Sequence, residues 1–292
     1  MIKGWAGLEK MIIRSRAAFT LVELLVVIAI IGLLSALVVV ATSGLREQAD
    51  INKVLAWVKR ADVSFKDNLM GSWSMDKTSA IHNSIIFDSS GQGNHGTLYT
   101  SDGTTNKAVA GMVNNALRFD GINDYVQLPD TGSLTSFTIV GWIKGEGDSL
   151  SGATGYNTFI GRASNRRLLY NTGGLMLAQM GPGNHWSTIT APRGRWNHIV
   201  YAYDAATNTA KWYINGQPDS EFVGATSFSS PYRIGSYDNV NYMMNGLIDE
   251  IRIYDIALTV SQIQSHYCAG LNKLLAKGLI SQEEYQEKMN LN

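Results

Sequence analysis

The acidic residues Glu146 and Asp148 form the one stretch of this sequence that begins a catalytic pattern. Glu146-Gly147-Asp148 starts the spacing Glu-x-Asp-x-x-Glu, which places two carboxylates on one strand. Such a pair, about 5.5 Å apart, lets one group act as nucleophile and the other as acid in glycoside hydrolysis. Ser151 stands where the second Glu is needed, in a stretch rich in Gly and Ser. The incomplete pair argues against a hydrolase, and we expect no catalytic residues.

The histidines and the cysteine give no further catalytic or zinc pattern. Cys268 is the only cysteine, so the chain can form no internal disulfide and no thiolate cluster. His198 alternates with Val200 and Ala202, as a buried strand residue would. No metal-ligand spacing is found among His82, His95, His185, His198 and His266.

Three oxygen-bearing residues are candidates for a calcium site. The stretch from Asp88 to Gly96 offers Asp88, Asn94 and many free carbonyls, which suits calcium's need for several oxygen ligands. Asp249 interrupts an apolar strand, where a bare carboxylate would be costly. The alternatives are turn chemistry at Asp88 and a salt bridge from Asp249 to Arg252.

A different carboxylate, Glu23, lies near the start of the apolar run from Phe19 to Ala41. From Leu24 to Ala41 no residue is charged, so the run is long enough to cross a bilayer as a helix. An ionisable group in such a helix is costly and indicates a function and a partner.

A basic leader followed by Phe19-Thr20-Leu21-Val22-Glu23 and the apolar run resembles the class III signal of type IV pilins and pseudopilins. The resemblance implies cleavage between Ala18 and Phe19 by prepilin peptidase and methylation of the new N-terminus. It also implies that Glu23 pairs with the terminal amine of a neighbouring pilin subunit in the filament. The pilus or secretion assembly platform is a further implied partner. The family usually has Gly where this chain has Ala18, and Met11 is an alternative start.

Two other interpretations of the apolar run remain open. One is a plain transmembrane anchor with Glu23 at the headgroup level. The other is a secretory signal peptide cleaved after Ala41-Thr42-Ser43, although an acidic residue rarely opens so long an apolar core.

Charge sets the orientation and excludes one class of partner. The 24 Lys and Arg balance the 24 Asp and Glu, so no overall field attracts nucleic acid. The basic residues before the apolar run predict that the N-terminus lies in the cytoplasm and that the chain crosses the bacterial cytoplasmic membrane once. Everything after Ala41 is then expected on the cell surface or in an extracellular filament. Those residues are Lys3, Lys10, Arg14 and Arg16.

The helix is expected to continue beyond the membrane to Met70. No proline occurs before Pro129, and an apolar stripe with spacings of three and four runs from Ile51 to Leu69. One helix from Phe19 to Met70 would be about 75 Å long. It would be either a pilin stalk or an ordinary linker helix.

After Gly71 the sequence predicts an antiparallel β-sandwich, because short β-rich runs alternate with turn residues and no helix intervenes. Asn215-Gly216 is a type I′ hairpin signal. The expected strands are Ala116–Phe119, Tyr125–Leu128, Phe137–Lys144, Asn157–Arg162, Arg167–Tyr170, Leu175–Gln179, Trp196–Asp204, Lys211–Ile214, Tyr232–Ile234 and Leu247–Tyr254.

Several stretches in this order resemble the laminin G-like, concanavalin A-like jelly roll. They include Asp88-Ser89-Ser90-Gly91-Gln92-Gly93-Asn94, Leu117-Arg118-Phe119-Asp120-Gly121, Trp212-Tyr213-Ile214-Asn215-Gly216 and Gly246-Leu247-Ile248-Asp249-Glu250. The resemblance implies two stacked sheets, binding of glycans or proteins, and often a calcium ion that the last-strand Asp249 reaches. Most tryptophans are expected in the core, and Trp186 is the one most expected on a loop.

The tail is expected to be helical. Thr259 with Gln262 and Ser281 with Glu284 are capping boxes, and Gly278 between them is a helix stop. This stretch is similar to the short C-terminal hairpin called SHOCT, which implies a small contact element.

The predicted fold is thus α+β and multidomain. Its parts are a leader (1–18), a transmembrane and stalk helix (19–70), a laminin G-like sandwich (71–258) and a helical tail (259–292). The expected protein is a minor pilin or pseudopilin that displays a carbohydrate- or protein-binding domain for adhesion or surface recognition. The alternative is a membrane-anchored, lectin-like surface protein that never enters a filament.

Overall fold

The computed structural model describes residues 21, 22, 24–26, 28–32, 66–148, 155–162, 166–181, 183–224, 228–238 and 241–290. The chain divides into two compact units, residues 1–53 and 54–292.

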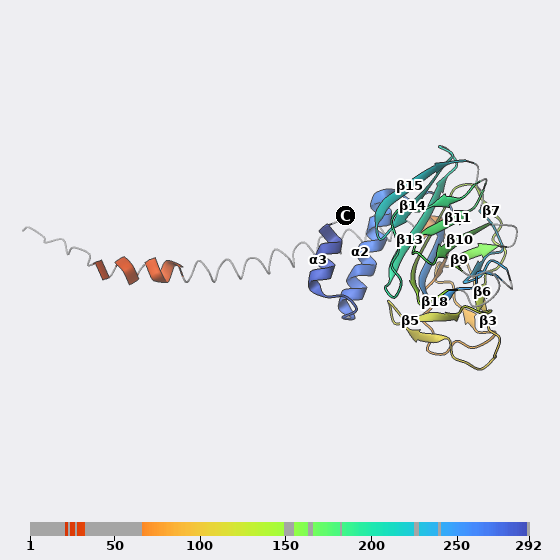
Figure 1. Ribbon diagram of the computed structural model, residues 1–292, viewed down its shortest axis with the longest axis horizontal. Coiled ribbons are helices and arrows are strands. Elements are labelled where there is room, and N and C mark those ends of the chain that lie inside the picture. Colours follow the sequence, from red (N-terminus) through yellow and green to blue (C-terminus); the bar gives the residue numbers. More distant parts are fainter. Residues whose placement is uncertain are drawn as a thin grey trace, which may run out of the picture. The chain divides into compact units, whose positions relative to one another are not determined.

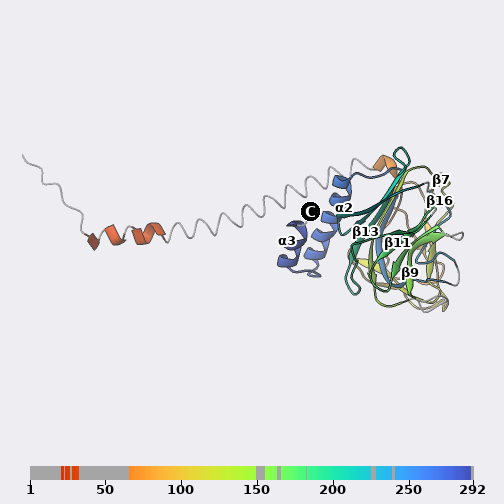
Figure 2. The ribbon, with the colours of Figure 1, turned by 45° about the horizontal axis from the view of Figure 1, so that its top comes forward.

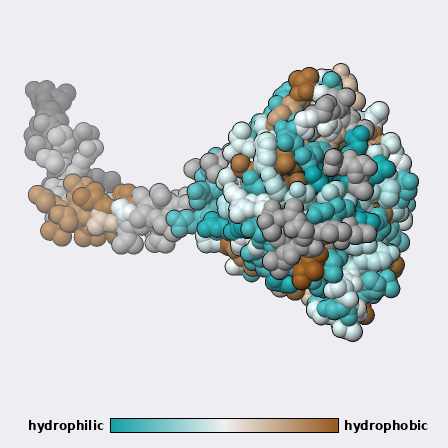
Figure 3. All heavy atoms as spheres, turned by 45° about the vertical axis from the view of Figure 1, so that its right-hand side comes forward, coloured by the Kyte–Doolittle hydropathy of each residue, from teal (hydrophilic) through white to brown (hydrophobic). Residues whose placement is uncertain are grey.

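In the first unit, residues 21, 22, 24–26 and 28–32 are helical. Their apolar side chains face outward: Leu21 is 80% exposed and Ile31 is 56% exposed, and they form a hydrophobic group in Figure 3. Such exposure in water is unfavourable, so this surface needs lipid or other helices to cover it. Across the described residues no helix is both long and apolar enough to span a membrane. Ala18, Phe19 and Glu23 lie outside the described residues.

The start of the second unit corrects one expectation. Leu69 and Met70 were expected to end a long helix, but a 3-10 helix, η1 (Lys66–Asn68), precedes strand β1 (Leu69–Trp73). Strand β1 pairs with β18 (Asn245–Tyr254) in antiparallel register, Ser72 opposite Arg252. This long-range pairing outweighs the helical spacing of the local sequence.

Two antiparallel sheets make up the sandwich (Figure 1). The first sheet has the order β15-β14-β13-β8-β18-β5-β4, with β1 also on β18, and the second has the order β12-β11-β10-β9-β17-β6-β3-β2. The other strands of the first sheet are β4 (Ala108–Ala110), β5 (Asn115–Asp120), β8 (Phe137–Gly145), β13 (Asn197–Asp204), β14 (Thr209–Ile214) and β15 (Gln217–Val223). The second sheet contains β2 (Ile85–Ile86), β3 (Gly96–Tyr99), β6 (Tyr125–Gln127), β9 (Tyr156–Arg162), β10 (Arg166–Asn171), β11 (Met176–Gln179), β12 (His185–Trp186) and β17 (Arg233–Ile234). A small third pair joins β7 (Ser133–Leu134) to β16 (Phe228–Ser229).

The main core lies between the two sheets, because alternate residues of each strand point inward. Phe137, Ile139 and Ile143 of β8 are fully buried there. Close contact between the sheets occurs at Gly141, where an added Cβ would lie 2.6 Å from the Phe159 ring of β9. The sheets therefore interdigitate at this point, and a larger residue at 141 would push them apart.

Helices α2 (Val260–Ala276) and α3 (Gln282–Asn290), which we call the C-terminal hairpin, lie on the β13 side of the sandwich (Figures 1 and 2). The predicted Thr259–Gln262 capping box is confirmed, with both reciprocal hydrogen bonds present. Gly278 has φ +66° after α2, and the Leu279 amide donates to the Leu274 carbonyl, as at a glycine-terminated helix end.

The C-terminal hairpin covers the outer face of the first sheet, and the residues of that face beneath the hairpin are largely apolar. Ile263 of α2 packs on Val140, Val200 and Ala202. Further along, Trp142 of β8 packs with Tyr267, Leu271, Leu274 and Tyr285. The first sheet is thus buried on both faces, which explains its nearly continuous runs of buried residues.

The predicted β-sandwich is confirmed, and each of the ten expected strands overlaps an observed one. The expected turn at Asn215-Gly216 joins β14 to β15, with φ of 52° and 79°. Short strands that the sequence analysis missed, such as β2 and β12, have only two residues each and show no periodicity.

Candidate ligand-binding site

The predicted calcium residues Asp88 and Asn94 do lie together. Both carboxylate oxygens of Asp88 are fully used: Oδ1 accepts from the Ser72 and Ser90 amides at 2.8 and 2.9 Å, and Oδ2 accepts from the Ser90 hydroxyl and the Asn94 amide at 2.8 and 2.9 Å. Burial alone would raise the pKa of Asp88, but these hydrogen bonds together lower it. Asp88 therefore holds its own loop as an ionised acceptor.

Asn94 has a similar role in that loop. Its side-chain amide donates to the Met70 carbonyl at 2.7 Å, and its backbone carbonyl accepts from the Trp73 indole at 2.9 Å. Asn94 thus fastens the loop to strand β1.

Asp249 belongs to a different network. Its Oδ2 accepts from the Met112 and Val113 amides at 3.0 and 3.1 Å, and its Oδ1 accepts from the Glu250 amide. Burial and the neighbouring Glu250 raise the pKa of Asp249 to about 8. Arg252, the alternative partner considered for Asp249, is paired with Glu250 instead.

The donor set does not fit calcium well. Asp88 could bind a cation only by giving up hydrogen bonds that it makes to its own loop. The described part of the chain contains no group of three or more His, Cys, Asp and Glu side chains that could hold a metal. Calcium binding stays a prediction from the sequence.

The residues of the incomplete catalytic pattern are both paired with arginines. Glu146 forms an ion pair with Arg118, and Asp148 forms one with Arg193. The hydrogen bond from Arg193 lowers the pKa of Asp148. The lowered pKa favours the ionised form of Asp148, so this carboxyl is not suited to act as a general acid. Ser151 lies outside the described residues.

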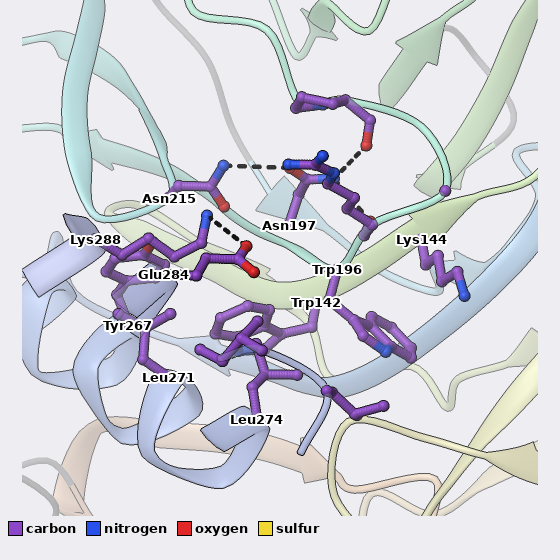
Figure 4. Close-up of a pocket in the computed structure, with 15 residues that line it drawn as sticks. Trp142, Lys144, Trp196, Asn197, Asn215, Tyr267, Leu271, Leu274, Glu284 and Lys288 are labelled. Atoms are coloured by element: carbon purple, nitrogen blue, oxygen red, sulfur yellow. Dashed lines mark hydrogen bonds and ion pairs between the residues drawn. The ribbon is translucent and has the colours of Figure 1, made fainter. Parts of the chain in front are cut away.

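A cavity of about 330 Å³ opens between the C-terminal hairpin and the first sheet (Figure 4). We call it the hairpin pocket. Its lining comes from five parts of the chain: strand β8, the loop before β13, the first residue of β13, the β14–β15 turn and the hairpin. The lining residues are Trp142, Lys144, Pro192, Gly194, Arg195, Trp196, Asn197, Asn215, Tyr267, Leu271, Leu274, Leu279, Ile280, Glu284 and Lys288.

Asn197 holds the loop that forms one side of the hairpin pocket. This buried residue donates to the Pro192 and Arg195 carbonyls at 2.8 and 2.9 Å. It also accepts from Asn215 at 3.2 Å, and Asn215 in turn accepts from the His198 amide. The hairpin turn at Asn215-Gly216 and the loop before β13 are therefore fixed relative to one another, as Figure 4 shows.

The hairpin pocket carries more positive than negative charge. Lys144, Arg195 and Lys288 line it, against the single carboxylate of Glu284. The Lys288 Nζ lies 3.6 Å from Oε1 of Glu284, which precedes it by one helical turn. Among the described residues no carboxylate pairs with Lys144 or with the Arg195 guanidinium. The pocket therefore presents cations that are available to a ligand.

Two tryptophans give the hairpin pocket flat apolar surfaces. Trp142 is 3% exposed and stacks on Tyr267, with ring centroids 5.9 Å apart and planes at 16°. Trp196 packs against the same cluster but is only partly buried. From the sequence most tryptophans were expected in the core, and no local pattern indicated that these two line one pocket. Trp186, expected on a loop, is partly exposed in β12 beside Tyr156.

Family profiles match two parts of this chain. Residues 13–39 match the prokaryotic N-terminal methylation motif, and residues 120–264 match the concanavalin A-like lectin/glucanases superfamily. The chain joins a pilin-type methylation motif to a concanavalin A-like domain. Both predicted resemblances are confirmed. The methylation motif also indicates a membrane-anchored, surface-exposed protein.

Solved structures share the fold of the concanavalin A-like domain. Domain 4 of an extracellular arabinanase from Geobacillus stearothermophilus, in complex with arabinotriose, is 24% identical with a TM-score of 0.53; the match covers 68% of this chain and 97% of that domain. The binding domain of Paraclostridial Mosquitocidal Protein 1 is 18% identical with a TM-score of 0.53, over 71% of this chain and 53% of that one. A Trypanosoma rangeli sialidase is 16% identical with a TM-score of 0.51, over 69% and 32%. These likenesses show the fold alone, and no curated protein matches the chain.

Proposed function

We propose that this chain is a minor pilin or pseudopilin that displays its concanavalin A-like domain at the cell surface for adhesion or recognition. One observation carries the proposal: the methylation motif and a lectin-type sandwich occur on the same chain. The methylation motif would anchor the domain in a filament at the cell surface, and the domain would let that filament bind a ligand.

The assembly part of the proposal assigns roles to three residues. Prepilin peptidase would cut between Ala18 and Phe19, and Glu23 would meet the terminal amine of a neighbouring pilin subunit. A carboxylate in an apolar run is tolerable when a cation meets it. The exposed apolar side chains among residues 21, 22, 24–26 and 28–31 support a helix that packs on lipid or on other helices.

The binding part of the proposal assigns the sandwich a glycan or protein ligand. The arabinanase domain of the same fold in complex with arabinotriose supports a glycan. The hairpin pocket supports a site on this chain, since it combines tryptophan surfaces with Lys144 and Arg195, whose charges no carboxylate of the described residues pairs. We propose no catalytic role, because Glu146 forms an ion pair with Arg118 and Asp148 forms one with Arg193.

Incorporation into filaments tests the assembly part. Cells that express wild-type chain together with Glu23→Val should place only the wild type in sheared filaments, because the variant leaves the terminal amine of a neighbour unpaired. Both chains should be found in the membrane fraction. Equal amounts of the two chains in filaments would rule out the pairing. Their presence in the membrane but not in any filament would favour the alternative, an anchored lectin-like protein.

A further inference from the structure

We propose that the hairpin pocket binds one sugar residue that carries a negative charge, either a carboxylate or a sulfate. The inference rests on the proposed binding function of the sandwich but not on pilus assembly. It assigns that function to a site that the C-terminal hairpin and the first sheet build together.

The size of the hairpin pocket fits this ligand. A cavity of about 330 Å³ lies at the lower end of the range for small-molecule sites. It therefore has room for one or two sugar rings. A long polymer could enter only by one end or by a side branch.

The tryptophans supply the surface that a sugar ring needs. One face of a pyranose ring presents C–H bonds, which pack on a flat aromatic ring, while its hydroxyls point to the side. Trp196 is partly exposed in the pocket and is supported by the cluster around Trp142. Trp142 itself is held in place by Tyr267, so the wall is rigid. A preformed wall loses little conformational entropy on binding.

The polar groups then select a charged sugar. Lys144 and Arg195 have no carboxylate partner among the described residues, and Lys288 adds a third cation. Charge-assisted hydrogen bonds to a carboxylate or sulfate are stronger than those to neutral hydroxyls. A neutral sugar would leave Lys144 and the Arg195 guanidinium without a charged partner.

Two further groups remain for hydroxyls. Asn215 uses one side-chain N–H on Asn197 and keeps the other. Glu284 can accept from a hydroxyl, since its carboxylate has more acceptor sites than Lys288 uses. The pocket therefore has a donor and an acceptor for ring hydroxyls in addition to the cations that would meet the anion.

Binding of three matched sugars to the purified full-length chain in detergent tests the proposal. The probes are the methyl glycosides of galactose, galacturonic acid and galactose 6-sulfate, measured by calorimetry or ligand-observed NMR. We expect at least one of the two anionic sugars to bind about tenfold more tightly than galactose at low salt. Raising the salt to about 0.5 M should reduce this preference, because screening weakens exposed charge pairs. The source of the charge, carboxylate or sulfate, follows from which anionic probe binds.

Variants locate the binding. Lys144→Gln and Arg195→Gln should each weaken the preferred anionic sugar about tenfold and leave the melting temperature unchanged. Trp196→Ala should weaken all sugars. Lys211→Gln is the matched control, because Lys211 pairs with Glu221 on the same sheet and does not line the pocket. It should bind like the wild type.

Several results would overturn the proposal. These are no binding of any probe, equal binding of galactose, and unchanged binding in Lys144→Gln and Arg195→Gln. Equal competition by N-acetylaspartate would reveal a plain carboxylate site and would also overturn it. None of these results affects filament assembly, so failure here is distinct from failure of the proposed function.

Discussion

Gly270 of helix α2 lies directly against the indole of Trp142 on strand β8. A Cβ added at position 270 would lie 2.0 Å from Cζ2 of that ring, so no other residue fits without movement. This contact sets how closely the C-terminal hairpin approaches the first sheet. The width of the hairpin pocket depends on it, because Trp142 lines the pocket.

Gly270→Ala should therefore destabilise the protein by about 1–3 kcal/mol, the usual cost of overpacking a core. Alanine is the better helix former, so loss of stability would show that packing outweighs helix propensity. Thermal melting and tryptophan fluorescence would measure the change. Ser261→Ala, at an exposed position of the same helix, is the control and should not lower the melting temperature. An equally stable Gly270→Ala protein would mean that the helix does not rest on Trp142.

His198 lies beneath the same hairpin and should make the protein sensitive to acid. Its side chain is fully buried between Trp142 and Tyr267, and neither ring nitrogen has a hydrogen-bond partner among the described residues. Burial, with the nearby positive charge of Arg252, lowers the pKa of His198 to about 3. Because the unfolded chain binds this proton near pH 6.5, stability should fall as the pH drops from about 6.5 toward 3.

His198→Leu should remove about 2 kcal/mol of the stability lost between pH 7 and pH 5. Chemical denaturation at the two pH values would measure this difference. Asp249 is present in both proteins, so its effect cancels in the comparison. His266 is also present in both, and burial, the largest cause of its lowered pKa, does not depend on His198. The control is His82→Leu, which lies away from the C-terminal hairpin and should keep the acid sensitivity. The same pH dependence in His198→Leu and the wild type would show that His198 is not buried as a neutral group.

Calcium can be tested at Asp88. The sequence predicts that millimolar calcium raises the melting temperature, but the hydrogen bonds lead us to expect equal melting in calcium and in EDTA. Asp88→Ala should lower stability by about 2–4 kcal/mol in both conditions, because three backbone amides lose their acceptor. Asp102→Ala, at an exposed loop residue, should have little effect. A clear rise with calcium that disappears in Asp88→Ala would contradict us and restore the calcium site.

Local patterns in the sequence predicted those parts of the fold that depend on neighbouring residues. Strand periodicity, the Asn215-Gly216 turn and the Thr259–Gln262 cap all appear in the structure. The prediction that the helix continues to Met70 was wrong at its C-terminal end. Residues 69–73 form strand β1 instead, because they pair with β18, which lies far along the chain.

The hairpin pocket could not be predicted for the same reason. Lys144, Arg195 and Glu284 come from separate elements, and each resembles an ordinary surface charge in the sequence. Only the docking of the C-terminal hairpin on Trp142 brings them to one cavity. Asp249, in contrast, is conspicuous in the sequence as an acidic residue in an apolar strand, and the structure shows that its carboxylate accepts from the Met112 and Val113 amides.

The mature N-terminus is the most direct test of the central proposal, that this chain is processed as a pilin and displays its lectin-type domain. Mass spectrometry of the protein purified from its own cells should find N-methylated Phe19 as the first residue. Peptides from the C-terminal hairpin should be present in the same molecule. A chain that begins at Met1 or Met11, or at Gly44 after signal-peptidase cleavage, would contradict the proposal.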